Sequence, residues 1–395
     1  DQGIVIYFPS PDSFTGEDVA EFHCHGGKII MEMVIERCLE LGARLARPGE
    51  FSERAFLNDK IDLIQAESIS DLINASSKAS AQSALLSMQG VFSDLVNELI
   101  EEIINLRKFV EACIDFPAED IDFLKDDDLT NGLNNCIKKI NLTIQQAQQG
   151  RVIQEGVRLA IVGKPNAGKS SLFNLFAGED LAIVTDIPGT TRDLLKENVF
   201  IDDLPVYLTD SAGLRETIDP IESEGIRRVH SEIKFANIIL YVIDVSAFNP
   251  DEDLKSIEKN VGKLVSKDCS IILVFNKTDL SGISTDQNMK SHYPSVDISV
   301  KNKTGIDNLK KLIIEAIGFN DLNENVFTAR RRHVKELTNA LRYLEMGKVQ
   351  LTNAGAGELL AEDLKLAQNC LSGITGSYLA DDLLGEIFSS FCIGK

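Results

Sequence analysis

Eight residues near the middle of the chain have the spacing of a phosphate-binding loop. They run from Gly163 to Ser170 and match GxxxxGK followed by Ser or Thr, between a β-branched apolar run and a helical pattern. In such a loop, glycines let backbone N–H groups turn toward a polyphosphate, and the helix N-terminus adds a positive dipole. Lys169 would reach the terminal phosphates, and Ser170 would offer its hydroxyl to Mg2+. The stretch therefore predicts nucleotide binding.

Four further segments follow this loop in the order expected of a GTPase. Two threonines of TDIPGTTRD precede a strand, DSAG follows the strand VYLT, VFNKTD ends another strand, and SVK ends the next. The threonine hydroxyls would complete Mg2+ coordination beside a γ-phosphate, and the DSAG carboxylate would lie near the metal. The predicted GTP-binding residues are Asn166, Ala167, Gly168, Lys169, Ser170, Ser171, Thr185, Thr190, Thr191, Asp210, Gly213, Asn276, Lys277, Asp279, Ser299, Val300 and Lys301.

The NKxD segment predicts which base is bound. Asp279 can accept two hydrogen bonds, from the N1–H and the exocyclic amine of guanine, and adenine offers neither group in that place. Because a buried carboxylate left unpaired is costly, ATP would be rejected by several kcal/mol. The sequence therefore predicts GTP as the nucleotide.

The residue that positions the attacking water is not where Ras-type enzymes have it. Leu214 follows DSAG, where those enzymes place a glutamine, and its side chain cannot form hydrogen bonds. Glu222 is the candidate instead, although its carboxylate could simply complement the dipole of a helix N-terminus. No arginine finger is identifiable in the sequence. A monovalent cation beside Asn166 could supply the missing positive charge.

Residue patterns divide the chain into four domain segments. Residues 1–60 mix a strand at Ile4–Phe8 with a helix over Ile29–Leu41 and predict a small α+β domain whose start is missing. Residues 61–153 and 320–395 have helical spacing, whereas residues 154–319 alternate strands and helices. The predicted fold class is multidomain, with an α/β P-loop GTPase domain inserted into a discontinuous all-helical domain. Neither helical half would cover its apolar faces alone.

Apolar spacing marks the individual helices of the two flanking segments. The predicted helices run through Leu63–Ile73, Leu95–Val110 and Leu133–Ile144 before the insertion, and over Phe327–Val349, Glu358–Leu371 and Leu379–Phe391 after it. The acidic stretch Asp115–Asp128 lacks the residue order of a calcium loop, so it predicts a solvated connection between helices.

Composition restricts the classes of function. A formal net charge of −21 argues against non-specific nucleic-acid binding, and the basic run Ala329–Lys335 is either a local RNA contact or a solvated helix face. Seven cysteines without a CxxC pair predict a reducing, cytoplasmic location, and no apolar run is long enough to insert into a membrane. His23 and His25 could bind a metal if a third ligand joined them, but ordinary hydrogen bonding is the simpler alternative.

These segments together resemble a known family. GKPNAGKSS, TDIPGTTRD, DSAGLRE, RPGEFSERAFLNDK and the terminal FCIGK are similar to the MnmE (TrmE) family of tRNA-modifying GTPases along essentially the whole chain. The GTPase segments indicate only the class of enzyme. The helical flanks and the Cys392–Lys395 ending indicate the family.

The resemblance implies several properties. Residues 1–60 would be a truncated folate-binding, dimerising domain, and the protein would be a K+-activated homodimer. With a flavoprotein partner, MnmG (GidA), it would modify C5 of the wobble uridine of certain tRNAs, using a one-carbon unit from a 5-formyl or 5,10-methylene tetrahydrofolate. The implied residues are Glu222 and Cys392 for catalysis, Ser170 and Thr191 for Mg2+, Asn166, Thr185, Ile187 and Thr190 for K+, and Glu21, Lys60 and Lys395 for folate.

Two alternatives stay open at the level of sequence. A regulatory GTPase switch could bind RNA or ribosomes through its flanks without any role in RNA chemistry; a KH-like flank with a GXXG loop would favour it, and the sequence contains none. Cys392 could be a small apolar residue that packs the last helical turn. We expect Leu383, Leu384, Ile387, Phe388 and Phe391 to dock this last helix, with Cys392 and Lys395 facing Glu21 and Lys60.

Overall fold

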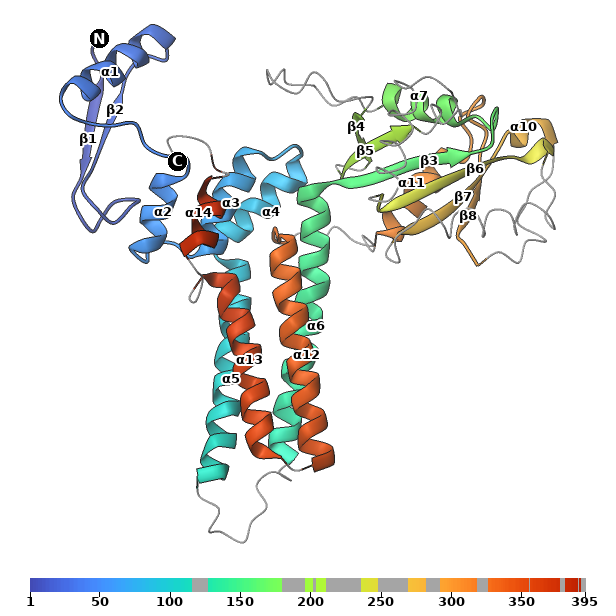
Figure 1. The fold of residues 1–395 in the computed structure, drawn as a ribbon. Helices are drawn as coiled ribbons and strands as arrows, with labels where there is room; N and C mark the ends of the chain where they lie inside the picture. Colours follow the sequence, from blue (N-terminus) through green and yellow to red (C-terminus); the bar gives the residue numbers. More distant parts are fainter. Residues whose placement is uncertain are drawn as a thin grey trace, which may run out of the picture. The chain divides into compact units, whose positions relative to one another are not determined.

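The protein forms two compact units. A computed structural model describes residues 1–115, 127–179, 196–201, 204–210, 236–247, 269–281, 292–317, 326–354, 356–376, 381–389 and 391. One unit contains residues 1–75, 80–150 and 325–395, and the other contains residues 76–79 and 151–324. Figure 1 labels their helices and strands. The middle of the chain thus forms one unit, and both flanking stretches belong to the other.

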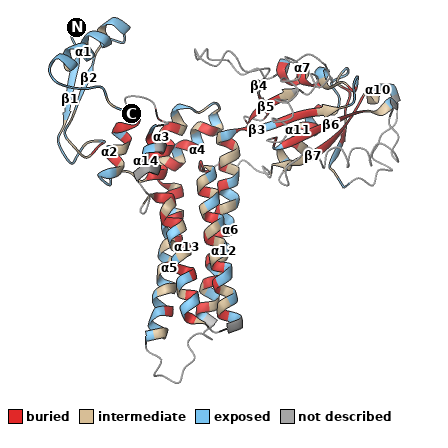
Figure 2. Ribbon diagram, viewed as in Figure 1, coloured by how far each residue is buried: buried red, intermediate tan, exposed pale blue. Residues whose placement is uncertain are grey.

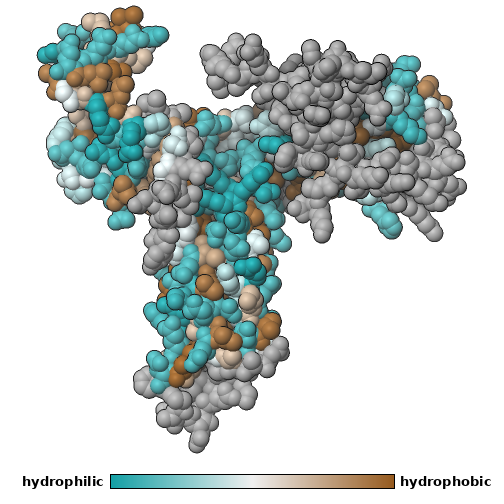
Figure 3. Space-filling model, viewed as in Figure 1, coloured by the Kyte–Doolittle hydropathy of each residue, from teal (hydrophilic) through white to brown (hydrophobic). Residues whose placement is uncertain are grey.

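A hairpin and a helix form the N-terminal part of the first unit. Strand β1 (Ile4–Phe8) pairs antiparallel with β2 (Val19–His23), and helix α1 (Lys28–Glu40) buries none of its residues. Apolar side chains are widely exposed on this part (Figure 2; Figure 3), including Val5 at 62%, Tyr7 at 60% and Met33 at 63%. A two-stranded hairpin is marginally stable by itself in water. This segment therefore contributes little core of its own.

Four long helices build the core of the first unit. They are α5 (Val91–Asp115), α6 (Asp127–Glu155), α12 (Arg331–Ala354) and α13 (Gly357–Thr375), and they lie side by side (Figure 1). Phe92, Ile103 and Leu133 from the first half of the sequence share one apolar cluster with Leu344 and Leu364 from the second. Each half buries apolar faces that it could not cover alone, which explains why the two stretches fold together.

Four shorter helices complete this unit: α2 (Glu50–Leu57), α3 (Leu63–Ile73), α4 (Lys78–Met88) and α14 (Asp381–Ser389). Helix α3 begins with a capping box, in which Asp62 Oδ1 accepts from the Gln65 N–H and Gln65 Oε1 accepts from the Asp62 N–H. Helix α4 was not predicted, because its Ser- and Ala-rich sequence lacks a strong apolar period. Among the helices that the structure describes, none is long and apolar enough to cross a membrane.

The segment before α12 differs from the prediction of a helix beginning at Phe327. The helix begins at Arg331 instead. The ring of Phe327 stacks on Phe92 at 4.3 Å between centroids, and the Thr328 hydroxyl donates to the Ser87 hydroxyl over 3.0 Å. These buried contacts hold the segment in a non-helical path, so tertiary packing overrides the local helical pattern.

The two ends of the inserted stretch meet within the first unit. A Cβ atom added to Gly150 would lie 1.9 Å from the carbonyl oxygen of Phe327. No larger residue fits without moving the backbone. The chain therefore leaves the helical unit and returns to it at one point of close contact.

A buried ion cluster lies beside this return point. Arg332 donates from Nε and Nη2 to the two carboxylate oxygens of Glu67 in α3, over 3.0 and 2.9 Å. It also donates to the carbonyl oxygens of Gly373 and Ile374 near the end of α13. Arg330 bonds Asp71, and His333 Nε2 lies 3.0 Å from Glu67 Oε2. Since Glu67 and His333 are both 2% exposed, the cluster is a charged joint between α3, α12 and α13. The predicted choice between an RNA contact and a solvated face is therefore wrong for these three basic residues.

The second unit is an α/β domain built on a six-stranded sheet. The strands are β3 (Val157–Gly163), β4 (Lys196–Ile201), β5 (Leu204–Asp210), β6 (Ile238–Asp244), β7 (Ser270–Asn276) and β8 (Ser295–Asp297), in the order β4-β5-β3-β6-β7-β8. Only the β4–β5 pairing among them is antiparallel. Helices α7 (Lys169–Glu179) and α11 (Ile306–Ala316) pack on the sheet through Leu172, Phe176 and Leu309. A parallel sheet of this kind gathers its loops at the carboxyl ends of the strands, where ligands bind.

Candidate nucleotide-binding site

The phosphate loop joins β3 to α7, as its sequence predicts. Lys169 is the first residue of α7, and its Nζ donates to the carbonyl oxygens of Gly163 and Lys164 over 2.9 and 3.0 Å. Gly168 has a φ of +100°, and a Cβ there would lie 2.1 Å from the Asn276 amide nitrogen. The backbone conformation and the close approach both require glycine. The loop backbone therefore wraps the Lys169 ammonium, and the lysine itself begins helix α7.

Asn276 connects three separate segments. Its Nδ2 donates to the Ala167 carbonyl oxygen over 2.9 Å, and its Oδ1 accepts from the Val300 N–H over 3.2 Å. The side chain is 3% exposed, so both bonds are shielded from water. The phosphate loop, the end of β7 and the loop after β8 are therefore held in one fixed arrangement.

Asp279 lies in the short helix α10 (Thr278–Ser281), with one carboxylate oxygen already engaged. The Ser299 hydroxyl donates to Asp279 Oδ1 over 2.7 Å. This bond orients the carboxylate toward a cavity of about 270 Å3, which is lined by Gly168, Ser171, Asn276, Lys277, Asp279, Leu280, Val300 and Lys301. The residues predicted to bind the base thus line the same cavity as two residues of the phosphate-loop region, Gly168 and Ser171.

One further charged residue of this edge was not predicted. Asp244, the last residue of β6, accepts from Lys277 Nζ at Oδ2 over 2.6 Å, and its Oδ1 accepts from the Ser246 hydroxyl and N–H. Burial alone would raise the pKa of the Asp244 carboxyl, but hydrogen bonds from Lys277 and Ser246 hold that pKa below its ordinary value. The signal in the sequence was a carboxylate at the end of the run IILYVID.

Comparison with known proteins places this site in a family. A family model described as the MnmE helical domain matches residues 63–392, and a model of the GTP-binding protein TrmE N-terminus matches residues 1–60. The chain belongs to the MnmE family of tRNA modification GTPases.

Individual MnmE proteins match along the whole chain. The tRNA modification GTPase MnmE of Coxiella burnetii is 49% identical over 395 residues, covering 100% of this chain and 87% of the relative. The MnmE of Legionella pneumophila is 50% identical over 395 residues, and that of Proteus mirabilis is 48% identical over 396, with the same coverage. The predicted resemblance to the MnmE family is confirmed.

Several of the predicted site residues lie outside the described residues. They are Thr185, Ile187, Thr190, Thr191, Gly213, Glu222, Cys392 and Lys395, together with most of the acidic stretch between α5 and α6. Asp210 is described as the last residue of β5, opposite Ile161 of β3, which brings its backbone beside the strand that enters the phosphate loop. The predictions for the eight residues remain predictions.

Two of the residues predicted to bind metal ions, Ser170 and Asn166, are among the described residues. Ser170 lies in the first turn of α7, directly after Lys169, the position from which this motif offers a hydroxyl to Mg2+. Asn166 adopts a left-handed φ of +64° inside the phosphate loop. An oxygen-bearing side chain held at such a bend suits a hard cation better than an apolar residue would.

The residues assigned to folate have partners within the first unit. Glu21 Oε2 lies 3.0 Å from His23 Nε2, and Lys60 Nζ donates to the Pro11 carbonyl oxygen over 2.8 Å. His25 bonds Asp1 instead of joining His23, and the described residues contain no group of three or more side chains suited to a metal. Each histidine is therefore hydrogen-bonded to a carboxylate, His23 to Glu21 and His25 to Asp1.

The last helix docks through four of the five residues predicted for it, and the side chain of the fifth, Leu383, lies outside what the structure describes. Ile387, Phe388 and Phe391 of the α14 region are buried against Leu63 and Ala66 of α3, and Leu384 is partly buried in the same cluster. The Phe388 ring lies 6.3 Å from that of Phe56 in α2. The residue that precedes Cys392 is therefore packed firmly against α2 and α3.

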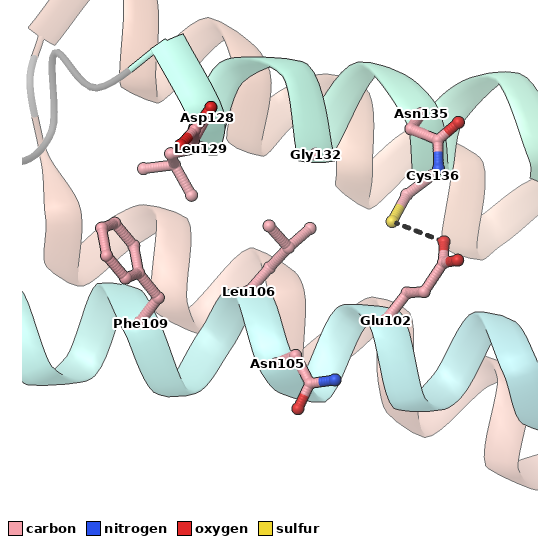
Figure 4. Close-up of a pocket in the computed structure, with 9 residues that line it drawn as sticks. All are labelled: Glu102, Asn105, Leu106, Phe109, Asp128, Leu129, Gly132, Asn135 and Cys136. Carbon is pink, nitrogen blue, oxygen red and sulfur yellow. Dashed lines mark hydrogen bonds between the residues drawn. The ribbon is translucent and has the colours of Figure 1, made fainter.

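A second hollow lies between α5 and α6 (Figure 4). It has a volume of about 450 Å3, and the Cys136 thiol in its wall donates to Glu102 over 3.6 Å. Burial, together with the Glu102 carboxylate, raises the pKa of Cys136 to about 12. A thiol must ionise to act as a nucleophile, so the raised pKa and the burial of Cys136 favour a packing role for this residue.

Proposed function

We propose that this chain is a K+-activated GTPase that, with an MnmG-type flavoprotein partner, modifies C5 of the wobble uridine of certain tRNAs. The observation that carries the proposal is the base end of the nucleotide site. Asp279 is oriented by Ser299 beside a cavity that Asn276 ties to the phosphate loop, in a chain that belongs to the MnmE family. The activity itself follows from what each part of the site can do.

The nucleotide would bind with its base at Asp279 and its phosphates over the phosphate loop. Lys169 would pair with the β- and γ-phosphates, while Ser170 and Thr191 would hold Mg2+. Asn166, with Thr185, Ile187 and Thr190, would hold K+, which supplies positive charge where an arginine finger otherwise acts. Glu222 would orient the water that attacks the γ-phosphate.

The one-carbon chemistry belongs to the other unit in this proposal. Glu21 would accept from the pterin N–H groups, and Lys60 and Lys395 would pair with folate carboxylates. A tetrahydrofolate derivative, in its 5-formyl or 5,10-methylene form, supplies the carbon when bound. Support comes from the docking of α14, because a terminus anchored through Phe388 and Phe391 can hold Cys392 in place.

The assembly and location are part of the same proposal. The N-terminal segment, with its exposed apolar residues, fits a homodimer better than an isolated monomer, because such surface is costly in water. The substrate tRNA and the flavoprotein partner are cytoplasmic molecules, so we assign the protein to the cytoplasm.

The nucleotide specificity gives the test of the proposal's enzymatic half. Purified protein should hydrolyse GTP and leave ATP and XTP untouched, and Asp279→Asn should shift the preference from guanine to xanthine nucleotides. The reason is that an amide can donate to the added carbonyl of xanthine, whereas a carboxylate cannot. Asp307→Asn, an exposed position at the start of α11, removes the same charge away from the site and serves as the control. Unchanged guanine preference in Asp279→Asn would remove the base-recognition role.

A further inference from the structure

Lys277 has an unusual backbone at the base-binding edge. Its φ is +69°, in the left-handed region that non-glycine residues rarely adopt and that costs about 1 kcal/mol or more. The residue nevertheless lines the cavity beside Asp279. Such a conformation persists only where the surroundings hold it. One partner of the Lys277 side chain lies at the end of the neighbouring strand.

Asp244 is that partner. The two residues follow neighbouring parallel strands, and the register of β6 and β7 sets Asp244 opposite Asn276, one residue before Lys277. The Lys277 ammonium lies 2.6 Å from Asp244 Oδ2. The lysine and aspartate side chains are 31% and 21% exposed, so water screens the pair only in part.

Ser246 fixes the aspartate in turn. Its hydroxyl and its N–H both donate to Asp244 Oδ1, over 2.6 and 3.0 Å, within the short turn Val245–Ala247. One carboxylate oxygen is therefore committed to the turn, and the other is left for the lysine. The three residues form a chain of contacts that begins outside the cavity and ends in its wall.

We propose that Asp244 is a positioning residue of the guanine site, which holds the alkyl stem of Lys277 against the plane of the bound base. Asp244 does not itself line the cavity, so it acts through the lysine. The ammonium is anchored at the outer end, and the methylene groups lie between that anchor and the backbone. A stem held in this way loses no rotamer freedom when the nucleotide arrives.

The proposal predicts a loss of affinity without a loss of chemistry. Releasing a lysine side chain costs its rotamer entropy on binding, which corresponds to about a tenfold weaker Kd for GDP. The base is the same distance from the reacting phosphate in ground and transition states, so kcat at saturating GTP should stay unchanged while KM rises. A merely structural role would lower kcat and thermal stability as well.

A double-mutant cycle tests the inference. In full-length protein, binding of a fluorescent GDP analogue is measured for wild type, Asp244→Asn, Lys277→Met and the double variant, with Asp307→Asn as the matched loss of a carboxylate. Asp244→Asn should weaken binding about tenfold in the wild-type background and less than about twofold in the Lys277→Met background, because the cycle isolates a contact made through the lysine. Equal weakening in both backgrounds, or wild-type binding by Asp244→Asn, would overturn the proposal.

A second variant covers the case in which Asp244→Asn does not fold. Ser246→Ala removes one of two donors to Asp244 Oδ1 and should weaken GDP binding about threefold, again only when Lys277 is present. No loss, or the same loss with Lys277→Met, would count against the proposal equally. The inference rests on the guanine site proposed above, and the two fail separately: Asp279→Asn tests the site, whereas the cycle tests only how Lys277 is held.

Discussion

The amide of Asn276 donates to the carbonyl oxygen of Ala167 over 2.9 Å, so the strand end that precedes the base-reading residues is tied to the phosphate loop. The segments proposed to bind the base and the phosphates are thus tied together by one buried amide. A change at Asn276 that breaks this tie should disturb the phosphate loop as well as the base-binding edge, and hydrolysis depends on phosphate alignment.

Hydrolysis should depend on the monovalent cation. At matched ionic strength, GTP turnover in K+ should exceed turnover in Na+ by about tenfold or more, because a cation at Asn166 replaces part of the charge of an arginine finger. The measurement is phosphate release at saturating GTP in the two chloride salts. Equal rates would refute the assignment of Asn166.

Glu222 should affect chemistry and not binding. Glu222→Ala should lower kcat by a factor of about a hundred, the usual scale of a positioned catalytic group, while the Kd for GTP stays nearly constant. Glu224→Ala, a carboxylate two residues further along, is the matched control and should leave kcat within about twofold. A parallel fall in affinity and rate for Glu222→Ala would mean that the residue is structural.

Parts of this site could be predicted from the sequence because they are short and local. The phosphate loop and NKxD each set their own geometry within a few residues, and Val- and Ile-rich runs mark the strands that carry them. Asp244 could not be assigned in this way, because its role depends on the register between β6 and β7. No spacing in the sequence shows which two strands lie side by side.

The joint around Glu67 shows the same limit in the helical unit. Arg332 and Glu67 are 265 positions apart, so a run of basic residues gave no sign that it faces a buried carboxylate. Phe327 also fits a helical pattern, but its stacking on Phe92 and the Thr328–Ser87 hydrogen bond keep this segment outside α12. Long-range contacts decided both cases.

This joint predicts a loss of stability in acid. Burial alone would raise the pKa of Glu67, but His333 and Arg332 hold that pKa well below its ordinary value of 4.5. Burial lowers the pKa of His333, and the Glu67 carboxylate raises it by a smaller amount. The pKa of His333 therefore lies below its ordinary value of 6.5. Both groups have a lower pKa in the folded than in the unfolded state, so the unfolded protein takes up their protons first as pH falls. The stability that each group contributes is therefore complete above its unfolded-state pKa and is lost as pH falls below that pKa. Unfolding should become easier below pH 6.5 and more steeply so below pH 4.5.

Removing the carboxylate tests this account. Glu67→Gln leaves the partly buried Arg332 beside a neutral amide and should lower the free energy of unfolding by about 3 kcal/mol at neutral pH. It should also flatten the pH dependence below 4.5. Denaturant unfolding followed by circular dichroism measures both, and Glu345→Gln on the exposed face of α12 should change stability by less than about 0.5 kcal/mol. A Glu67→Gln protein as stable as wild type would contradict the role of the joint.

The most direct test of the central claim is nucleoside analysis of tRNA from bacteria that lack their own MnmE and carry this protein or its variants. Wild type should restore the C5-modified wobble uridine. Lys169→Ala should fail because the phosphates lose their lysine, and Cys392→Ser should fail while its purified protein still hydrolyses GTP, because the thiol and the phosphate loop lie in different domains. Full restoration by Lys169→Ala, or no restoration by wild type in the presence of the flavoprotein partner, would contradict the account and favour a regulatory switch without a role in RNA chemistry.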